Sequence, residues 1–365
     1  MEEIVLITPK SFKKSDYSSF AIVADVGGTN TTLAIMGAKS STSFEIIFKH
    51  TYQTKEITLF ETILNTALRE AKELYDIETN AACLAAAGYL EKNRTYAKLT
   101  NCDRTIDTTQ IIKKTLLAKI LLLNDFEAIG YGLDTLNLEK DTLQLNPDAP
   151  KNPDSRNTFA AIGPGTGLGM SIAPFDPRKG LHIPLPTEGG HMDFPASSEL
   201  EVELMWFIRK KQPSPKNHTP GFEDVLSGRG MENIYDFLST KYPLTPVTKI
   251  INKFSGAEKL DKIRENHSRD GQCKKTVEMF ITFYARAAKN LALLSCCYSG
   301  LFLAGRIALK YQDHLKTPLF LNEVRKQGSN FLKTLPIYLI TTPDIALHGC
   351  CNFALNKQNP ESSML

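Results

Sequence analysis

The sequence lacks the long apolar segments that would place it in a membrane or mark it for export. The longest apolar run, Leu291 to Gly305, is shorter than the roughly 20 residues that a membrane-spanning helix needs. The first residues, Met1 to Phe20, include three lysines but no apolar stretch of signal-peptide length. We therefore expect a cytoplasmic protein without a membrane partner.

Blocks of like charge are also absent. The chain has 43 Lys and Arg residues against 40 Asp and Glu residues, which gives a net charge of +3. Proteins that bind nucleic acid concentrate basic residues in arms or patches. Nucleic acid is therefore not expected as a main partner, and the oligomeric state is left open, a homodimer included.

Cysteine is present but without the spacing of a disulfide framework or a zinc site. The count is odd, at seven, and no CxxC motif occurs. Two adjacent pairs, Cys296/Cys297 and Cys350/Cys351, could act as redox pairs, but buried cysteine used as a small apolar residue is much more common. The second interpretation is favoured.

The composition is that of a globular protein with more than one core. Of its 365 residues, 42% are hydrophobic and 23% are charged, and domains commonly contain roughly 100–200 residues. We expect two domains, a smaller N-terminal α/β domain over 1–130 and a larger C-terminal α/β domain over 131–365. The C-terminal tail could return to the first domain.

Two Gly-rich turns, each between apolar runs, indicate a duplicated unit. FAIVADVGGTNTTLAIM, from Phe20 to Met36, reads as strand, tight turn and strand, and FAAIGPGTGLGMSIA, from Phe159 to Ala173, repeats the pattern. Aligning Gly28-Thr29 with Gly165-Thr166 also pairs further apolar positions of the second strands. The chain thus resembles two copies of one unit.

Other segments alternate between helical and strand-like periodicity, which predicts a largely parallel sheet covered by helices. Capping boxes are expected at Thr58 to Glu61 and at Ser198 to Glu201, each at the start of an amphipathic helix. The remaining expected elements are a strand over Ala81 to Ala87, a helix from Asp107 through Ala118, a strand over Ile120 to Leu123, an exposed loop over Lys210 to Pro220, a helix from Met231, a long helix over Thr276 to Ser295, strands over Leu301 to Ala304 and Ile337 to Thr341, and a helical tail.

The first Gly-rich turn has the chemistry of a phosphate site. In DVGGTN, Asp25 ends a buried strand and the glycines allow backbone amides to approach an anion. Asp25 could hold magnesium directly or through water. A plain hairpin turn is the alternative interpretation, because Gly-Gly turns are common.

The second turn, GPGTGLG from Gly163 to Gly169, contains more glycine than a hairpin requires, which suggests backbone held near a ligand. It lacks the GK[ST] ending of a Walker loop, and no helix pattern follows it as in a dinucleotide fold.

Three further segments carry polar groups suited to a small polyol. In LLLNDF, Asn124 and Asp125 follow an apolar strand, where open α/β sheets bind ligands, although the pair could instead cap the next helix. EGGHMD supplies Glu188 and His191 on flexible backbone, and EDVLSGRG supplies Glu223 at a turn before a helix.

Taken together and in their order along the chain, the five motifs resemble the bacterial glucokinase family, within the hexokinase, actin and heat-shock ATPase superfamily. The resemblance covers about residues 18 to 355, and Leu301-Phe-Leu-Ala-Gly305 resembles the family's adenosine motif. It implies a two-lobed actin-like ATPase fold of duplicated ribonuclease-H-like units with an interdomain cleft. It also implies transfer of a phosphoryl group from ATP to the 6-hydroxyl of glucose, with Mg²⁺ as cofactor.

Residue by residue, the resemblance makes Asp125 the catalytic base. It implies that the sugar is bound by Asn124, Asp125, Glu188, His191 and Glu223. It implies that the nucleotide is bound by Gly27, Gly28, Thr29, Asn30, Gly165, Thr166, Gly167 and Gly305.

The sequence departs from the family pattern at two positions. Arg306 stands where the family commonly has a second glycine, and Cys102 follows Thr100-Asn101 where an aromatic residue is usual. A kinase for another hexose is the nearer alternative function. A non-catalytic sugar sensor is the more distant one, because the extension before Phe20 is too short for a helix-turn-helix domain and Asp125 is intact. The related repressor and sugar-kinase family shares the EGGH-like segment but carries a cysteine-rich zinc motif, which is absent here.

Overall fold

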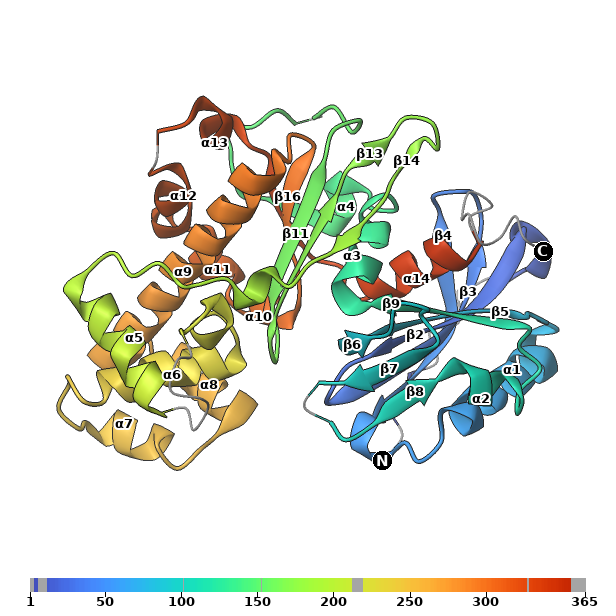
Figure 1. Ribbon diagram of the computed structural model, residues 1–365, viewed down its shortest axis with the longest axis horizontal. Helices are drawn as coiled ribbons and strands as arrows, with labels where there is room; N and C mark the ends of the chain where they lie inside the picture. Colours follow the sequence, from blue (N-terminus) through green and yellow to red (C-terminus); the bar gives the residue numbers. More distant parts are fainter. Residues whose placement is uncertain are drawn as a thin grey trace. The chain divides into compact units, whose positions relative to one another are not determined.

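The structure is a computed structural model that describes residues 3–5 (backbone only), 12–100, 102–151, 153–211, 219–326 and 328–355. The described residues form two compact units. Unit 1 lies within Met1–Lys140, Ala173–Pro186 and Asp344–Leu365, and unit 2 within Asp141–Ile172 and Thr187–Pro343. Figure 1 labels the elements of both.

The main sheet of unit 1 is mixed. Its strands are β1 (Glu3–Val5), β2 (Ser19–Val26), β3 (Asn30–Ala38), β4 (Phe44–Gln53), β5 (Ala81–Ala86) and β9 (Lys119–Asn124), in the order β1-β4-β3-β2-β5-β9. β2, β5 and β9 are parallel, whereas β2, β3 and β4 pair antiparallel. The prediction of a largely parallel sheet is therefore right for one half only, because the Gly-Gly turn makes β2 and β3 a hairpin. A small antiparallel sheet adds β6 (Gly88–Leu90), β7 (Tyr96–Leu99) and β8 (Thr105–Asp107).

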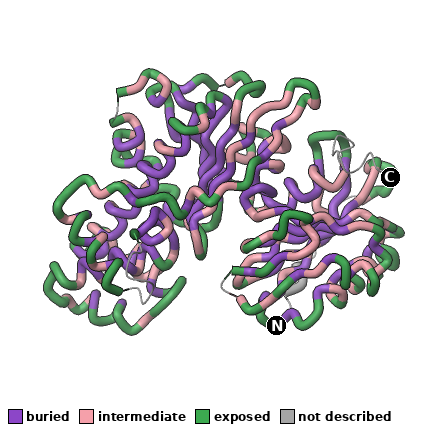
Figure 2. The backbone as a smooth tube through the Cα atoms, in the orientation of Figure 1, coloured by how far each residue is buried: buried purple, intermediate pink, exposed green. Residues whose placement is uncertain are grey.

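Helices pack on both faces of this sheet. Alternate residues of β2, such as Ile22 and Ala24, share a core with α1 (Phe60–Tyr75). The intervening positions face the helices α3 (Asp125–Leu133) and α14 (Ile345–Leu355), and α14 contacts both β2 and β5. Figure 2 shows that buried residues gather in the central strands, whereas exposed residues are most frequent in the peripheral helices and loops.

α3 and α14 approach each other very closely. A Cβ at Gly132 would lie 2.5 Å from the Ile345 carbonyl oxygen, and one at Gly349 would overlap the Ala128 carbonyl oxygen. Overpacking at such a contact costs typically 1–3 kcal/mol. This contact fixes the helix whose first residue is Asp125.

Two predicted helix ends in unit 1 are wrong. α1 begins at Phe60 with Leu59 as N-cap and no side-chain cap, so Thr58 does not form the predicted capping box. Asp107 does cap α2 (Thr108–Ile112), but this helix stops well before Ala118. The Thr115 hydroxyl accepts from the Leu117 N–H at 3.4 Å, a local turn that competes with helix.

The sheet of unit 2 repeats the arrangement of unit 1. It contains β10 (Thr142–Gln144), β17 (Ile337–Ile340), β16 (Gly300–Leu303), β11 (Phe159–Pro164) and β12 (Leu168–Ala173) in that order, with β11, β16 and β17 parallel. β12-β11-β16-β17 thus matches β3-β2-β5-β9, each set starting with two strands joined by a Gly-rich turn. The predicted duplication and both predicted strand-turn-strand segments are confirmed.

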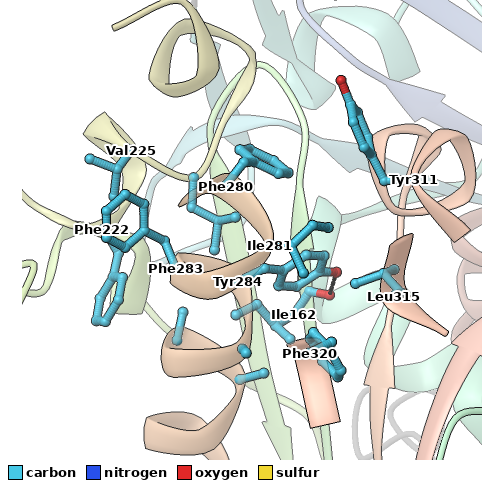
Figure 3. Close-up of a cluster of buried hydrophobic side chains, with 14 of the residues drawn as sticks. Ile162, Phe222, Val225, Phe280, Ile281, Phe283, Tyr284, Tyr311, Leu315 and Phe320 are labelled. Atoms are coloured by element: carbon cyan, nitrogen blue, oxygen red, sulfur yellow. Dashed lines mark hydrogen bonds between the residues drawn. The ribbon is translucent and has the colours of Figure 1, made fainter. Parts of the chain in front are cut away.

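The helices of unit 2 surround the long helix α9 (Gly271–Ser295). In chain order the others are α5 (Glu199–Lys211), α6 (Gly228–Leu238), α7 (Pro246–Ile251), α8 (Gly256–Glu265), α10 (Arg306–Lys310), α11 (Gln312–Leu315), α12 (Pro318–Arg325) and α13 (Asn330–Thr334). α9 packs against β11, α6, α8 and α12. The Tyr284 hydroxyl of α9 donates to the Ile162 carbonyl of β11 at 3.2 Å within the core shown in Figure 3.

Two further predictions concern α5. The Ser198 hydroxyl accepts from the Glu201 N–H at 3.3 Å, as a capping residue should, but the Glu201 carboxylate accepts from the Ser197 N–H and not from the Ser198 N–H. The helix continues to Lys211, so the predicted loop does not start at Lys210. Residues 212–218 of that loop lie outside the described residues.

The cysteines are free thiols, and most are buried. Burial raises the pKa of the Cys297 thiol to about 12 and the pKa values of Cys350 and Cys351 well above the ordinary value. A thiol that does not ionise is a poor nucleophile. For these three residues the structure agrees with the interpretation that the sequence favoured, a small apolar side chain, whereas Cys296 is exposed and does not follow it.

Candidate active site

Two acids meet at the carboxyl end of the parallel strands of unit 1. Asp25 on β2 is in register with Ala85 on β5, and Ala85 is in register with Leu123 on β9. Asp125 follows β9 as the first residue of α3. Strand pairing therefore brings Asp25 and Asp125 to one edge of the sheet.

The environment of Asp125 changes its acidity. Burial raises the pKa of Asp125 to about 7, and the negative charge of Asp25 adds to that shift. Hydrogen bonds from the Phe126 N–H and from Asn124 act in the opposite direction without cancelling it. A carboxylate with a pKa near neutrality is suited to accept and release protons under ordinary cellular conditions.

A capping box holds the start of α3. The Asn124 side-chain oxygen accepts from the N–H groups of Phe126 and Glu127, and the Glu127 carboxylate accepts from the Asn124 N–H. Arg94, from the turn between β6 and β7, pairs with both carboxylate oxygens of buried Glu127, at 2.8 and 3.1 Å. Asn124 therefore caps α3, which is the alternative that the sequence left open. Arg94 supports this cap through Glu127, and no sequence motif indicated that role.

Thr54 holds the first Gly-rich turn in place through hydrogen bonds, and it lies in a short 3₁₀ segment (Thr54–Glu56). The Thr54 hydroxyl donates to the Gly27 carbonyl at 2.7 Å, and its N–H donates to the Thr29 carbonyl at 2.9 Å. Its side chain is fully buried and also bonds the Thr31 hydroxyl at 3.0 Å. Thr54 therefore binds two carbonyls of the turn, while Thr29 at its tip is exposed.

The second Gly-rich turn joins β11 to β12 and is closed by its own backbone. The Gly165 N–H donates to the Gly167 carbonyl at 2.7 Å, and Gly165 and Thr166 are exposed. From outside the turn, the Gly228 N–H donates to the Gly165 carbonyl at 2.9 Å. The start of α6 is thereby tied to the turn.

Glu223 is the second anchor of this turn. Its Oε2 accepts from the Leu168 N–H at 3.0 Å, and a Cβ at Gly167 would lie only 2.6 Å from the same oxygen. Glu223 sits in a 3₁₀ segment (Phe222–Asp224), and its neighbours Phe222 and Val225 are buried in the core drawn in Figure 3. Spacing in the sequence gives no sign of this contact, because the partners lie on segments far apart in the chain.

Gly305 lies beside the second turn. Its φ of 93° favours glycine, and a Cβ there would lie 3.4 Å from the Pro164 carbonyl oxygen. Arg306, the departure from the family pattern, is the exposed first residue of α10. A helical position does not require glycine, so this departure fits the local backbone.

The EGGH segment packs against β12 through its glycines. A Cβ at Gly190 would overlap the Leu168 carbonyl oxygen, and one at Gly189 would lie 2.7 Å from the Met170 sulfur. Glu188 and His191 are both exposed, with 3.7 Å between a carboxylate oxygen and Nε2.

A backbone bond from the Phe222 N–H to the Met192 carbonyl, at 2.8 Å, joins this segment to the one that carries Glu223. In unit 2, the sequence-predicted residues Glu188, His191, Glu223 and Gly165 to Gly167 therefore belong to one connected cluster. In unit 1, Asp25, Asn124 and Asp125 lie at one sheet edge, next to the Gly27 to Asn30 turn that continues β2. Cys102, the second departure from the family pattern, packs against the unit 1 core, and Asn101 before it lies outside the described residues.

Two other features are absent from the described residues. No helix combines the length and apolarity needed to cross a bilayer. No three His, Cys, Asp or Glu side chains gather as they would around a metal held by protein ligands alone.

Comparisons with known proteins agree with the motifs. The glucokinase family model matches residues 22–357. The glucokinase of Trichormus variabilis is 30% identical over 346 residues, which cover 90% of this chain and 96% of the relative.

Two solved structures share the fold. The glucokinase from an Antarctic psychrotroph matches with a TM-score of 0.75 and 24% identity over 93% of this chain and 99% of its own. The Balamuthia mandrillaris glucokinase, in complex with glucose, matches with a TM-score of 0.76 and 22% identity over 91% of this chain and 92% of its own. Because the family model spans nearly the whole chain and the motifs stand in the family's order, this protein belongs to the glucokinase family.

Proposed function

We propose that this protein is a glucokinase that transfers the γ-phosphoryl group of Mg-ATP to the 6-hydroxyl of glucose, giving glucose 6-phosphate and ADP. One observation carries the catalytic assignment: Asp125 lies at the end of a buried parallel strand with its pKa raised to about 7. A base must be ionised to accept a proton and must have enough affinity for it, and a pKa near 7 satisfies both requirements at neutral pH.

In the proposed reaction, the Asp125 carboxylate accepts the proton of the sugar 6-hydroxyl as that oxygen attacks the γ-phosphorus. The bond from the γ-phosphorus to the bridging oxygen breaks, and ADP leaves with the electron pair. The capping box of α3 and the Arg94–Glu127 pair hold the helix that carries Asp125. Such transfers depend mainly on positioning and on charge stabilisation, which rigid supports provide.

The sugar is proposed to contact Asn124, Glu188, His191 and Glu223 in addition to Asp125. Glu188 and His191 are exposed and supply an acceptor and a ring that can donate or accept. Glucose was present in the Balamuthia mandrillaris structure that shares this fold.

The nucleotide is proposed to bind the two Gly-rich turns and Gly305. The backbone at the tips of both turns is open to solvent, where a phosphate can approach. Thr54 binds carbonyls of the first turn, and the Gly228 N–H binds the Gly165 carbonyl of the second. Backbone amides in such turns are anion sites.

Magnesium fits the donor set present. Mg²⁺ typically takes one or two protein carboxylates and completes its shell with water and substrate phosphates. Asp25 is the carboxylate proposed to hold it, directly or through water. When bound, the ion would neutralise phosphate charge.

Replacement of the base tests this function. Asp125→Ala is expected to lower kcat by about 10²–10⁴-fold, the loss that follows removal of a general base. Glucose binding, measured by calorimetry, should persist because four other sugar contacts remain. Near-normal kcat in a folded Asp125→Ala variant would show that another group is the base.

A further inference from the structure

We propose that Arg229 binds the terminal phosphates of the nucleotide, and that Glu223 holds its guanidinium ready for that contact. This inference deepens the proposed function and rests on it. It adds a positively charged side chain to a set of proposed site residues that contains no lysine or arginine.

The need for such a group follows from charge. The proposed site residues include the carboxylates of Asp25, Asp125, Glu188 and Glu223, but no lysine or arginine. A triphosphate brings further negative charge, and phosphoryl transfer builds up charge on the γ-phosphate oxygens. Enzymes of this class counter it with metal ions together with Lys or Arg side chains.

Arg229 lies where it can meet a phosphate at the second turn. It is the second residue of α6, and the preceding Gly228 donates its N–H to the Gly165 carbonyl at 2.9 Å. Its Nη2 lies 3.3 Å from Oε1 of Glu223, while Oε2 of the same carboxylate accepts from the Leu168 N–H. One carboxylate therefore links the guanidinium to the backbone of the turn.

The present partners of Arg229 would release it at little cost. Its side chain is 60% exposed, and its contacts with Glu223 and Asp224 are single and long, at 3.3 and 3.5 Å. The acids themselves are more buried, with 21% and 7% of their side chains exposed, but the guanidinium end of both pairs is open to water, which screens the attraction. A phosphate accepts two parallel N–H bonds from a guanidinium, which is a stronger arrangement.

Both acids keep other partners when Arg229 leaves. Asp224 accepts from the Gly221 N–H at 3.0 Å through its other oxygen, Oδ2. Glu223 keeps the Leu168 N–H. The exchange therefore leaves neither carboxylate without a donor.

The competing interpretation is that Arg229 only orients Glu223 for the sugar. The two roles differ in which ligand loses affinity when the guanidinium is removed. A phosphate ligand affects ATP and spares AMP, which has no terminal phosphates. An orienting residue affects glucose.

Calorimetric titrations with Mg-ATP, AMP and glucose separate these roles in the intact protein. Arg229→Gln is compared with Arg156→Gln, which removes the same charge from unit 2 at an exposed position just before β11, at the end of this strand opposite the turn. Arg229→Lys keeps the charge but not the planar fork, and should recover part of the affinity.

The expected result for Arg229→Gln is a loss of about 10-fold or more in ATP affinity, as for a hydrogen bond between charged groups. AMP and glucose affinities should stay within about 2-fold of the wild type, as should every ligand in Arg156→Gln. The proposal would be overturned if Arg229→Gln and Arg156→Gln bound ATP equally well. It would also be overturned if Arg229→Gln lost as much affinity for AMP as for ATP, or lost affinity for glucose alone. These titrations do not depend on turnover, so a wild type that binds both ligands but phosphorylates no hexose would refute the glucokinase function separately.

Discussion

Asp125 illustrates how position alone gives one aspartate an unusual chemistry. The other acid at this sheet edge, Asp25, contributes its charge, and burial removes the water that would otherwise stabilise an ionised Asp125. Together these effects move the pKa of Asp125 from 3.8 to about 7. The same carboxyl on an exposed loop would be a much weaker base.

The raised pKa predicts the pH dependence of catalysis. Because only ionised Asp125 can accept the proton, kcat/KM for glucose should fall as the pH drops below about 7, with the slope of a single proton. An ordinary aspartate would stay ionised down to about pH 4. A coupled assay between pH 5 and 9 measures the profile, and a flat profile from pH 5 to 8 would contradict the assignment.

Thr54 allows a second test at the residue scale. Thr54→Val keeps the side-chain shape and the backbone N–H but removes the hydroxyl that donates to the Gly27 carbonyl. We expect KM for ATP to rise and kcat to fall, each by roughly 10-fold, because the first turn loses its fixed geometry. Glucose affinity should not change.

Thr54→Ser is the matched control, since it restores the hydroxyl and should recover activity. A purely structural role would instead lower stability in the valine variant without separating ATP from glucose. Steady-state kinetics with each substrate varied, beside a thermal melt, distinguish these results.

At the scale of elements, the strands and Gly-rich turns could be predicted from the sequence because they depend on local pattern. Alternation of apolar residues and paired glycines defines β2, β3, β11 and β12 without any distant partner. Helix ends were less predictable. The Thr58 capping motif has no role because α1 starts at Phe60, where the first side chain reaches the core.

The site residues likewise differ in how far local sequence predicts them. The order of the motifs predicts Asp25, Asp125 and the two turns as site residues. The side chains that hold these residues in place depend on contacts between distant segments. The Glu223–Leu168 bond, the Arg94–Glu127 pair and the Thr54 anchor each join different elements. No local pattern encodes such a contact.

Glycine at positions 28 and 165 can serve either of two purposes, a backbone with positive φ or the close approach of a phosphate. The structure places neither among the positive-φ residues. A Cβ at Gly165 would meet its nearest atom, the Gly167 carbonyl oxygen, at 3.9 Å. Close approach of a phosphate is therefore the remaining reason for glycine at position 165.

Two alanine substitutions in the second turn test this reason. Gly165→Ala should fold with an unchanged Tm but bind ATP less tightly, because the added methyl group meets only the ligand. Gly167→Ala should lower the Tm and weaken ATP binding, because its Cβ would lie 2.6 Å from the Glu223 carboxylate. Thermal melts and ATP titrations on both variants give the comparison, and unchanged ATP affinity in Gly165→Ala would remove that turn from the nucleotide site.

At the scale of the whole molecule, the chain consists of two units with the same strand order, and each has been adapted differently. Unit 1 carries the proposed base and the acid proposed to hold magnesium, and unit 2 carries Arg229 and the acids proposed to bind the sugar. The C-terminal helix α14 belongs to unit 1, where it packs against α3.

The base also affects the stability of the fold. A carboxyl whose folded-state pKa is raised favours folding most below its unfolded pKa, and that contribution is lost as the pH rises through the folded value. Above pH 7 the folded protein must therefore hold an ionised Asp125 in a half-buried position. Asp125→Asn removes this cost, while its amide oxygen can still accept from the Phe126 N–H.

We expect Asp125→Asn to raise the Tm by a few degrees at pH 8, since 1 kcal/mol corresponds to roughly 2–4 °C for a protein unit of this size. The gain should be smaller at pH 5, where the wild type keeps Asp125 protonated. Calorimetric melts at both pH values measure it. A lower Tm for the variant at pH 8 would mean that ionised Asp125 is stabilised in the fold, contrary to the raised pKa.

The most direct test of the central claim is a coupled assay of purified wild type and Asp125→Asn with ATP, ADP or polyphosphate as donor and glucose, mannose, fructose or N-acetylglucosamine as acceptor. We expect the wild type to have its highest kcat/KM with glucose and ATP, to form glucose 6-phosphate, and to depend on Mg²⁺. Asp125→Asn should lose about 10²-fold or more in kcat. Preference for another hexose, a phosphate on a different hydroxyl, or equal turnover by the two proteins would contradict the account.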